Sequence, residues 1–320
     1  MSNASLKSEF QKSSFKIATR GSELAIWQAK WVQKMILQKF PKISVELIII
    51  KTTGDRILDK PLSKIGGKGL FLKELEKALL EEKVDIAVHS MKDVTSSLPE
   101  GLEISVIAKR EYPADAWICP KFGSIDKFPK GGLVGTSSLR RQSQLKYHRP
   151  DLRFCNLRGN VQTRIRKLDE GIVQATILAE AGLKRIRLHD RISEILPMDY
   201  MLPAIGQGAI GIETRVGDEQ TFDKIKHIND RITWDCLMAE RSLLNSFQGN
   251  CQIPLAGHCF LKQNKLVLRS AIGDLEGKKL LRYESSSNRN KAIELGKKVA
   301  HYLLENGGKE ILEKISNESN

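Results

Sequence analysis

Arginines and hydroxyl side chains gather where predicted strands give way to helices in the middle of the chain. The stretch Gly135–Arg141 (GTSSLRR) places three hydroxyls and two arginines at one such junction, and Leu157–Asn160 (LRGN) and Ala181–Arg185 follow the next two strands. Helix N-termini bind anions, and the planar fork of arginine pairs with carboxylates or phosphates. The recurrence predicts that these arginines converge on one anion-binding site. For GTSSLRR alone, an ordinary helix cap followed by surface arginines is an equal alternative.

The basic residues are concentrated in the same region. The formal net charge is +14, and residues 139–191 hold 13 Lys or Arg against five Asp or Glu. Such a field favours an anionic partner, either nucleic acid or a small polyanion. Tyr147 and Phe154 are the only aromatic residues of this stretch, which provides little for base stacking. A basic polyanion-binding or nucleic-acid-binding α/β protein is nevertheless the alternative class.

A lysine and an aspartate directly follow a predicted strand in the first third of the chain. Asp85–Ser90 (DIAVHS) reads as the strand, so Lys92 and Asp93 come at its C-terminal end, where open α/β sheets bind ligands. A carboxylate in such a position can stabilise a cation and move a proton. A solvated ion pair at the strand end is the simpler alternative for these two residues.

The cysteines and histidines show no metal-site or disulfide pattern. Five widely spaced cysteines without a C-x-x-C pair indicate a reducing compartment, and the six histidines lack metal-ligand spacing, so no metal is predicted. Cys251 differs from the others because its sequence, Gln248–Pro254 (QGNCQIP), is rich in turn formers and would expose it. From spacing alone, an inert buried thiol remains the alternative.

Three layers of secondary structure must position these residues. Strands are predicted over 15–19, 45–50, 85–90, 103–108, 116–119, 133–135, 152–157 and 175–178, and the helices between them begin after Ser22 and span 72–81, 138–147 and 161–170. This alternation is typical of mostly parallel α/β sheets. A helix over 232–247, an antiparallel pair over 260–272 and 279–285, and a helix over 289–305 predict a smaller α+β layer.

We therefore expect three domains: residues 15–110 with 208–228, residues 111–207, and residues 229–320. Pro and Gly mark hinges at Glu111–Asp115 and Leu202–Gly208. Between Lys51 and Leu70, about twenty residues lack periodicity, which is typical of a lid. The glycines around Lys68 lack the spacing of a phosphate-binding P-loop, so that reading is rejected.

Composition excludes several classes of protein. The 320 residues are 41% hydrophobic and 28% charged, as in ordinary globular chains. The longest apolar runs are strand-sized, so no membrane span is predicted. We expect residues 1–14 to be a short tail and not a secretory signal. A cytoplasmic monomer is expected, with organellar import as an alternative, and an exported solute-binding protein is disfavoured.

Seven motifs, in order, resemble porphobilinogen deaminase (hydroxymethylbilane synthase). They are Ala18–Ser22 (ATRGS), Gly66–Phe71 (GGKGLF), His89–Asp93 (HSMKD), Gly135–Arg141 (GTSSLRR), Leu157–Asn160 (LRGN), Leu202–Gly208 (LPAIGQG) and Asn250–Pro254 (NCQIP). The departures are small: Glu23 and Thr95 stand where the family often has proline, and Asn250 where it has a second glycine before the cysteine.

The resemblance implies two α/β domains like those of a periplasmic binding protein and a smaller C-terminal α+β domain. It implies a transferase of heme biosynthesis that joins four porphobilinogen molecules head to tail, releases ammonia, and frees linear hydroxymethylbilane. A dipyrromethane cofactor is expected in thioether linkage to Cys251. Each pyrrole carries an acetate and a propionate, so a growing chain accumulates carboxylates that arginines can bind.

The same resemblance assigns residue roles. It implies that Asp93 stabilises the cations and shuttles protons. It implies that Lys92, Ser138, Arg140, Arg141 and Lys68 hold the cofactor. Substrate would be held by Arg20, Ser22, Arg158, Arg164, Arg185 and Gln207, with Phe71 and Lys68 on a covering lid.

Overall fold

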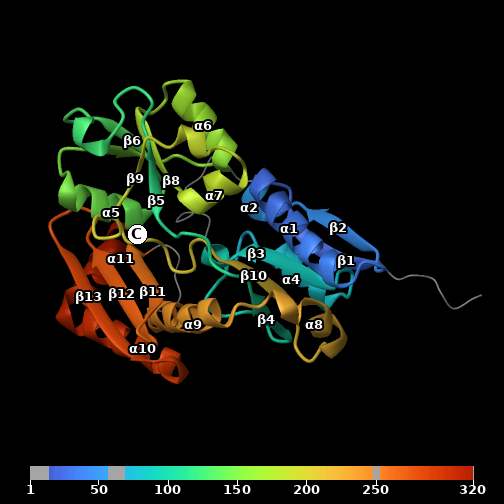
Figure 1. The fold of residues 1–320 in the computed structure, drawn as a ribbon. Coiled ribbons are helices and arrows are strands. Elements are labelled where there is room, and N and C mark those ends of the chain that lie inside the picture. The colour runs from blue at the N-terminus through green and yellow to red at the C-terminus, as the bar shows by residue number, and fades with distance from the viewer. Residues whose placement is uncertain (1–13, 57–68, 248–252, 320) are drawn as a thin grey trace, which may run out of the picture.

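The computed structural model describes residues 14–56, 69–247 and 253–319. Three sheets organise the chain, and Figure 1 shows them as separate layers, with the antiparallel C-terminal sheet in orange and red. The predicted fold class, two α/β layers with a smaller α+β layer, is confirmed. None of the helices in these ranges has the length and apolar character that a membrane span requires.

The N-terminal sheet has the strand order β2-β1-β3-β10-β4. Its strands are β1 (Phe15–Arg20), β2 (Val45–Ile50), β3 (Ile86–Ser90), β4 (Leu102–Ile107) and β10 (Ile210–Arg215). Its helices are α1 (Glu23–Lys39), α2 (Thr53–Arg56), α4 (Lys73–Leu80) and α8 (Glu219–Ile225). β1 is parallel to β2 and β3, whereas β10 is antiparallel to β3 and β4. The late strand β10 thus returns the chain to its first sheet.

Alternation along β1 explains why helices cover both faces of this sheet. Ile17 packs in the cluster that contains Val32 and Ile36 of α1, while the next residue, Ala18, packs with Leu75 of α4. The buried face of α1 consists mainly of small and medium-sized side chains: Ala25, Gln28, Ala29, Val32 and Ile36. The larger apolar side chains of this helix, which also recur every three to four residues, are only half-buried: Leu24, Trp27, Trp31 and Met35.

The middle sheet has the order β7-β6-β8-β5-β9. It comprises β5 (Asp115–Ile118), β6 (Leu133–Gly135), β7 (Arg153–Cys155), β8 (Ala175–Ala179) and β9 (Glu194–Ile195), with helices α5 (Leu139–His148), α6 (Val161–Asp169) and α7 (Glu180–Arg185). β6 is parallel to β7 and β8, and β5 is antiparallel to β8 and β9. Separate apolar clusters fill the two faces, one around Trp117 and one around Leu157.

The C-terminal sheet is antiparallel throughout, in the order β11-β12-β13. β11 (Leu255–Lys262), β12 (Lys265–Gly273) and β13 (Leu280–Asn288) pack with α9 (Arg231–Ser246), α10 (Ala292–Leu303) and α11 (Lys309–Ser319). The expected strand over 260–272 is wrong, because the chain reverses within it. Gln263 and Asn264 form that turn with φ of 47° and 63°, a left-handed conformation reached here without glycine.

Two segments cross between the N-terminal and middle sheets side by side. Residues 108–114 leave the N-terminal sheet and residues 196–209 return to it, and Glu111 N donates to Gly208 O at 3.2 Å. Gly206 and Gly208 have φ of 75° and 88°, and a Cβ on Gly206 would lie 2.9 Å from the carbonyl carbon of Met91. The glycines of the LPAIGQG motif therefore let this crossing approach the strand end that carries Lys92 and Asp93.

Candidate active site

Lys92 and Asp93 lie in a 3₁₀ turn, Met91–Asp93, directly after β3. Met91 anchors the turn, because its side chain is buried and its N–H donates to Ala209 O at 3.0 Å. Asp93 is exposed and Lys92 is half-buried. Burial lowers the pKa of Lys92 to about 8, and nearby charges on Asp93, Arg141, Asp115 and Arg164 contribute in opposing directions. The strand-end pair of the N-terminal sheet is therefore close to charged groups of the middle sheet.

Arg140 and Arg141 share one buried carboxylate. Arg140 Nη1 lies 2.7 Å from Asp115 Oδ2, and Arg141 Nη2 donates to Asp115 Oδ1 at 2.7 Å. Arg140 also donates to Leu202 O, and Arg141 to Ile177 O. The two arginines are each 5% exposed, and Asp115 is fully buried. The two guanidinium groups thus have partners within the protein, namely the Asp115 carboxylate and two backbone carbonyls. Their assignment to the cofactor stays a prediction.

Ser138 and Gln207 have structural partners as well. Ser138 is the N-cap of α5, and its Oγ accepts from Arg141 N at 3.4 Å. Gln207 is fully buried, and its Nε2 donates to Pro113 O at 2.7 Å and to Asp115 Oδ1 at 3.0 Å. Gln207 therefore joins the two crossing segments through these bonds, and its role in binding substrate stays a prediction.

Arg158 and Arg164 flank the N-terminus of α6. Asn160 caps this helix by accepting from Thr163 N at 2.8 Å, and Arg164 Nε donates to Gly159 O at 2.9 Å. Burial lowers the pKa of Arg164 to about 10; the charges of Arg141 and Arg158 contribute to this fall, and the charge of Asp93 opposes it. Repulsion among these cations is relieved when an anion binds among them.

Arg185 reaches the crossing segment from the end of α7. Its Nη2 donates to Gly208 O at 2.7 Å, and its guanidinium carbon lies 5.6 Å from the centre of the Trp27 ring. Burial lowers the pKa of Arg185 to about 10, while Glu111 raises it. Arg185 thus links α7 to α1 of the N-terminal sheet.

Arg20 ends β1, and Ser22 caps the helix that follows. Ser22 Oγ accepts from Ala25 N at 3.3 Å, so the predicted start of α1 is confirmed. Arg20 forms an ion pair with Asp55, and its guanidinium carbon lies 4.1 Å from the centre of the Phe71 ring. Arg20 and Phe71, which the sequence separates by fifty residues, are therefore in direct contact.

Two predicted site residues, Lys68 and Cys251, lie outside the described residues, as does most of the predicted lid. The other cysteines are free thiols: Cys119, Cys236 and Cys259 are buried, and Cys155 is half-buried. Burial raises the pKa of Cys119 and of Cys155, which disfavours the reactive thiolate at neutral pH. Over the described ranges, no three His, Cys, Asp or Glu side chains are grouped to hold a metal.

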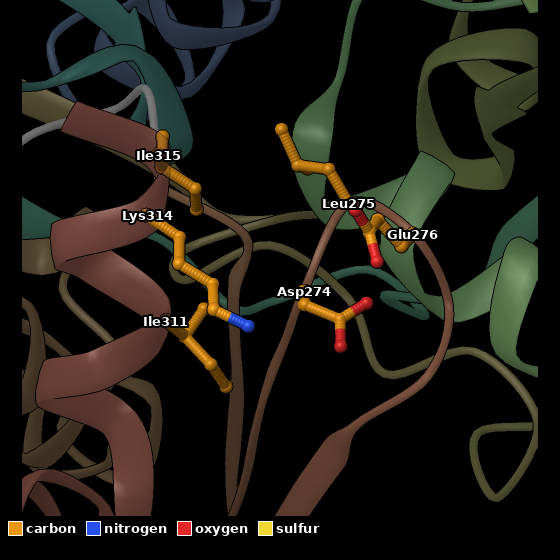
Figure 2. Close-up of a pocket in the computed structure, with 6 residues that line it drawn as sticks. All are labelled: Asp274, Leu275, Glu276, Ile311, Lys314 and Ile315. Atoms are coloured by element: carbon orange, nitrogen blue, oxygen red, sulfur yellow. The ribbon is translucent and has the colours of Figure 1, made fainter. Parts of the chain in front are cut away.

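Two recesses away from these residues do not suit a carboxylate-rich substrate. Figure 2 shows one, where Leu275 and Glu276 of the β12–β13 connection face Ile311 and Lys314 of α11; its volume of about 20 Å³ accommodates a single water. The other, of about 300 Å³, is lined by Glu103, Asp218 and Glu219 at the outer edge of the N-terminal sheet. Its carboxylates would repel an anion.

Comparison with known proteins settles which family this arrangement represents. Residues 15–223 match the family model described as porphobilinogen deaminase, dipyromethane cofactor binding domain, and residues 234–305 match the porphobilinogen deaminase C-terminal domain. The porphobilinogen deaminase of Pelobacter propionicus is 47% identical over 300 residues, which cover 94% of this chain and 96% of that protein. The chain belongs to the porphobilinogen deaminase family. It is thus a transferase of porphyrin biosynthesis with a dipyrromethane cofactor, as predicted.

Two solved structures are distantly similar to this chain. The periplasmic VFT2 domain of BvgS from Bordetella pertussis is 13% identical, covers 68% of this chain and 93% of that one, and has a TM-score of 0.39. The aliphatic sulphonate binding protein SsuA from Escherichia coli is 12% identical, covers 73% and 70% of the two chains, and has a TM-score of 0.41. No argument below rests on these two similarities.

The residues present fit the cofactor of the porphobilinogen deaminase family. Burial lowers the pKa values of Lys92 and Arg164, and the charge of Arg141 lowers both of them further, while the charge of Asp93 opposes the two shifts. Cations whose protonated forms are disfavoured in this way are suited to a group that carries several carboxylates.

Sequence reasoning missed two acids of this site. Asp115 entered the prediction only as a hinge residue, although an aspartate that begins the apolar run DAWIC is a signal of a buried, paired charge. Asp55 lies in the expected lid region, and nothing local to it indicates that it pairs with Arg20.

Proposed function

We propose that polymerisation takes place where the β3 end of the N-terminal sheet faces the arginines of the middle sheet, with Asp93 as the catalytic residue. The observation that carries this proposal is the electrostatic proximity of Lys92 and Asp93 to Arg141 and Arg164. It brings one exposed carboxylate together with several cations at a sheet's C-terminal end.

Asp93 would supply a negative charge beside the cations that form during the reaction. Loss of ammonia from porphobilinogen leaves a cation, and joining two pyrroles leaves a proton to be removed. A fixed carboxylate stabilises positive charge as it develops and can accept that proton. Lys92, the neighbouring residue, would hold a carboxylate.

The arginines hold substrate in this proposal. Arg20, Arg158, Arg164 and Arg185 would pair with acetate and propionate groups, and Ser22 would add a hydroxyl. A charge-assisted hydrogen bond contributes roughly 1.5 to 3 kcal/mol, so several together fix the position of the reacting carbon. Phe71 would shield the substrate carboxylate at Arg20 from water.

The cofactor would be linked to Cys251 and held by Lys92, Ser138, Arg140, Arg141 and Lys68. When bound, the dipyrromethane supplies the pyrrole position to which the first substrate is joined. Because Asp115 already neutralises part of the charge of Arg140 and Arg141, these two arginines would bind through N–H groups that Asp115 does not use.

We further propose a cytoplasmic monomer with neither a nucleic-acid nor a membrane partner, divided at residues 110/111, 207/208 and 228/229. The scarcity of aromatic residues among the arginines supports the absence of nucleic-acid binding. Gel filtration tests whether the protein is a monomer. Salt-dependent retention on a polynucleotide column would contradict the proposed absence of nucleic-acid binding.

The intact mass of the purified protein tests the cofactor assignment. We expect the mass to exceed that of the sequence by two pyrrole units, and peptide mapping should place the addition on Cys251. An active protein without added mass would contradict it. So would an adduct on another cysteine (Cys119, Cys155, Cys236 or Cys259).

A further inference from the structure

Asp55 occupies one edge of the Arg20 guanidinium. Arg20 Nε donates to Asp55 Oδ2 at 3.3 Å, and Arg20 Nη2 pairs with Asp55 Oδ1. The carboxylate thus takes the Nε side of the planar fork, and the guanidinium has five N–H groups in total. Within the described residues Arg20 Nη1 has no hydrogen-bond partner, so the edge formed by Nη1 and Nη2 remains for a second carboxylate.

Asp55 is itself held in place by Thr52, three residues before it. Thr52 Oγ1 donates to Asp55 Oδ2 at 2.7 Å, and Thr52 N donates to the same oxygen at 3.3 Å. These bonds and the Arg20 pair lower the pKa of Asp55 against the effect of its burial, so the carboxylate stays ionised at neutral pH. A carboxylate that accepts four hydrogen bonds from two residues is costly to displace.

The face of the guanidinium is fixed as well. The Phe71 ring lies over it, and the ring packs so tightly on Gly54 that a Cβ there would overlap the ring. Gly54 N also donates to Leu70 O at 2.9 Å, and this bond joins the segment that carries Asp55 to the segment that carries Phe71. One edge and one face of Arg20 are therefore set by the protein, which is the arrangement expected for a preorganised binding group.

We propose that Asp55 is a positioning residue for substrate: it holds Arg20 so that the Nη1–Nη2 edge binds a carboxylate of porphobilinogen. This inference rests on the proposed role of Arg20. Asp55 stays paired when substrate binds, and does not act as a competitor that substrate must displace.

A second ion pair in the same chain provides a matched control. Arg149 donates from Nε and Nη2 to the two oxygens of Asp151, each at 2.8 Å. The side chains of this pair are 21% and 30% exposed, against 22% and 29% for Arg20 and Asp55. Asp151→Asn therefore removes an equivalent ion pair elsewhere in the protein.

The experiment compares holoenzyme variants by steady-state kinetics and thermal unfolding. For Asp55→Asn we expect KM for porphobilinogen to rise roughly 10- to 100-fold, by analogy with the loss seen when the hydrogen-bonded partner of a metal-ligating residue is removed. The fall in kcat should be no more than about threefold, because the lost interaction is one of binding. Asp55→Glu should recover part of the affinity, and Asp151→Asn should leave KM unchanged at a similar melting temperature.

A binding readout separates the result from turnover. With limiting porphobilinogen, intact mass should show fewer enzyme molecules carrying added substrate for Asp55→Asn than for Asp151→Asn. If Asp55→Asn does not fold, Thr52→Val removes a bond to Asp55 but keeps the charge, and it should give a smaller rise in KM in the same direction.

Arg20→Gln distinguishes failure of this inference from failure of the proposed site. If Arg20→Gln raises KM but Asp55→Asn does not, the positioning role is wrong and the substrate role of Arg20 stands. A KM below that of wild type for Asp55→Asn would show that Asp55 competes with substrate. If neither variant changes KM, Arg20 does not bind substrate and both assignments are wrong.

Discussion

Glu76 makes the stability of this protein depend on pH in a predictable direction. Glu76 is 6% exposed on α4, where burial raises its pKa from 4.5 to about 7. The charge of Glu213 contributes to this rise, whereas the charges of His89 and Lys73 oppose it. Glu213 Oε2 is bonded to His89 Nε2 at 2.8 Å, so the three acid and imidazole groups form one buried cluster beneath α4.

The sign follows from proton binding. A carboxyl group with a raised pKa binds its proton more tightly in the folded than in the unfolded state, so stability falls as the pH rises from 4.5 through about 7. At about 1.4 kcal/mol per pKa unit, Glu76 should lower the free energy of unfolding by roughly 2.5 kcal/mol between pH 5 and pH 8. Above pH 8 this contribution is constant.

Denaturant unfolding of Glu76→Gln across this pH range is the assay. Gln cannot ionise, so the variant should gain about 2.5 kcal/mol relative to wild type between pH 5 and pH 8, whatever its offset at pH 5. Glu100→Gln, at an exposed position, should stay parallel to wild type. A difference between Glu76→Gln and wild type that is constant within about 0.5 kcal/mol would refute the reasoning.

Three further changes have definite expected outcomes. Asp115→Asn should destabilise the protein by about 3 to 5 kcal/mol in denaturant unfolding, because two buried arginines lose their counter-charge, and a loss below about 1 kcal/mol would contradict that view. Gly54→Ala should displace the Phe71 ring and raise KM; an unchanged KM would mean that the ring does not help position Arg20. Activity should decline above pH 8 as Lys92 loses its proton, and Lys92→Arg should move that decline to higher pH; an identical alkaline limb would assign the decline to another group.

Local patterns predicted most elements of the fold. β2 and β6 begin and end at the predicted residues, because each is a short apolar run bounded by polar or turn residues. The β11–β12 turn was not predicted, because Gln263 and Asn264 indicate a left-handed conformation less strongly than glycine does. The helix α11 was missed since its apolar residues Ile311, Leu312 and Ile315 pack on a core formed by distant strands.

The site was predictable where a motif carries its own geometry. Lys92 and Asp93 follow a strand, and Ser138 precedes a helix, so sequence order already places them. Pairing of Arg140 and Arg141 with Asp115 depends instead on how β5 lies beside β8, which no local pattern specifies. The burial of Gln207 has the same origin, because it results from the contact of two crossing segments.

Single-turnover release of ammonia by Asp93→Asn tests the central claim most directly. Asn keeps the shape and hydrogen bonding of Asp93 and loses the charge, so the rate should fall by at least the roughly 10² to 10⁴ attributed to general acid–base groups. Asp93→Glu should retain more activity, and substrate should still bind both variants through the arginines. An Asn variant within a few-fold of wild type would mean that another group performs the chemistry and that Asp93 is only a strand-end ion pair.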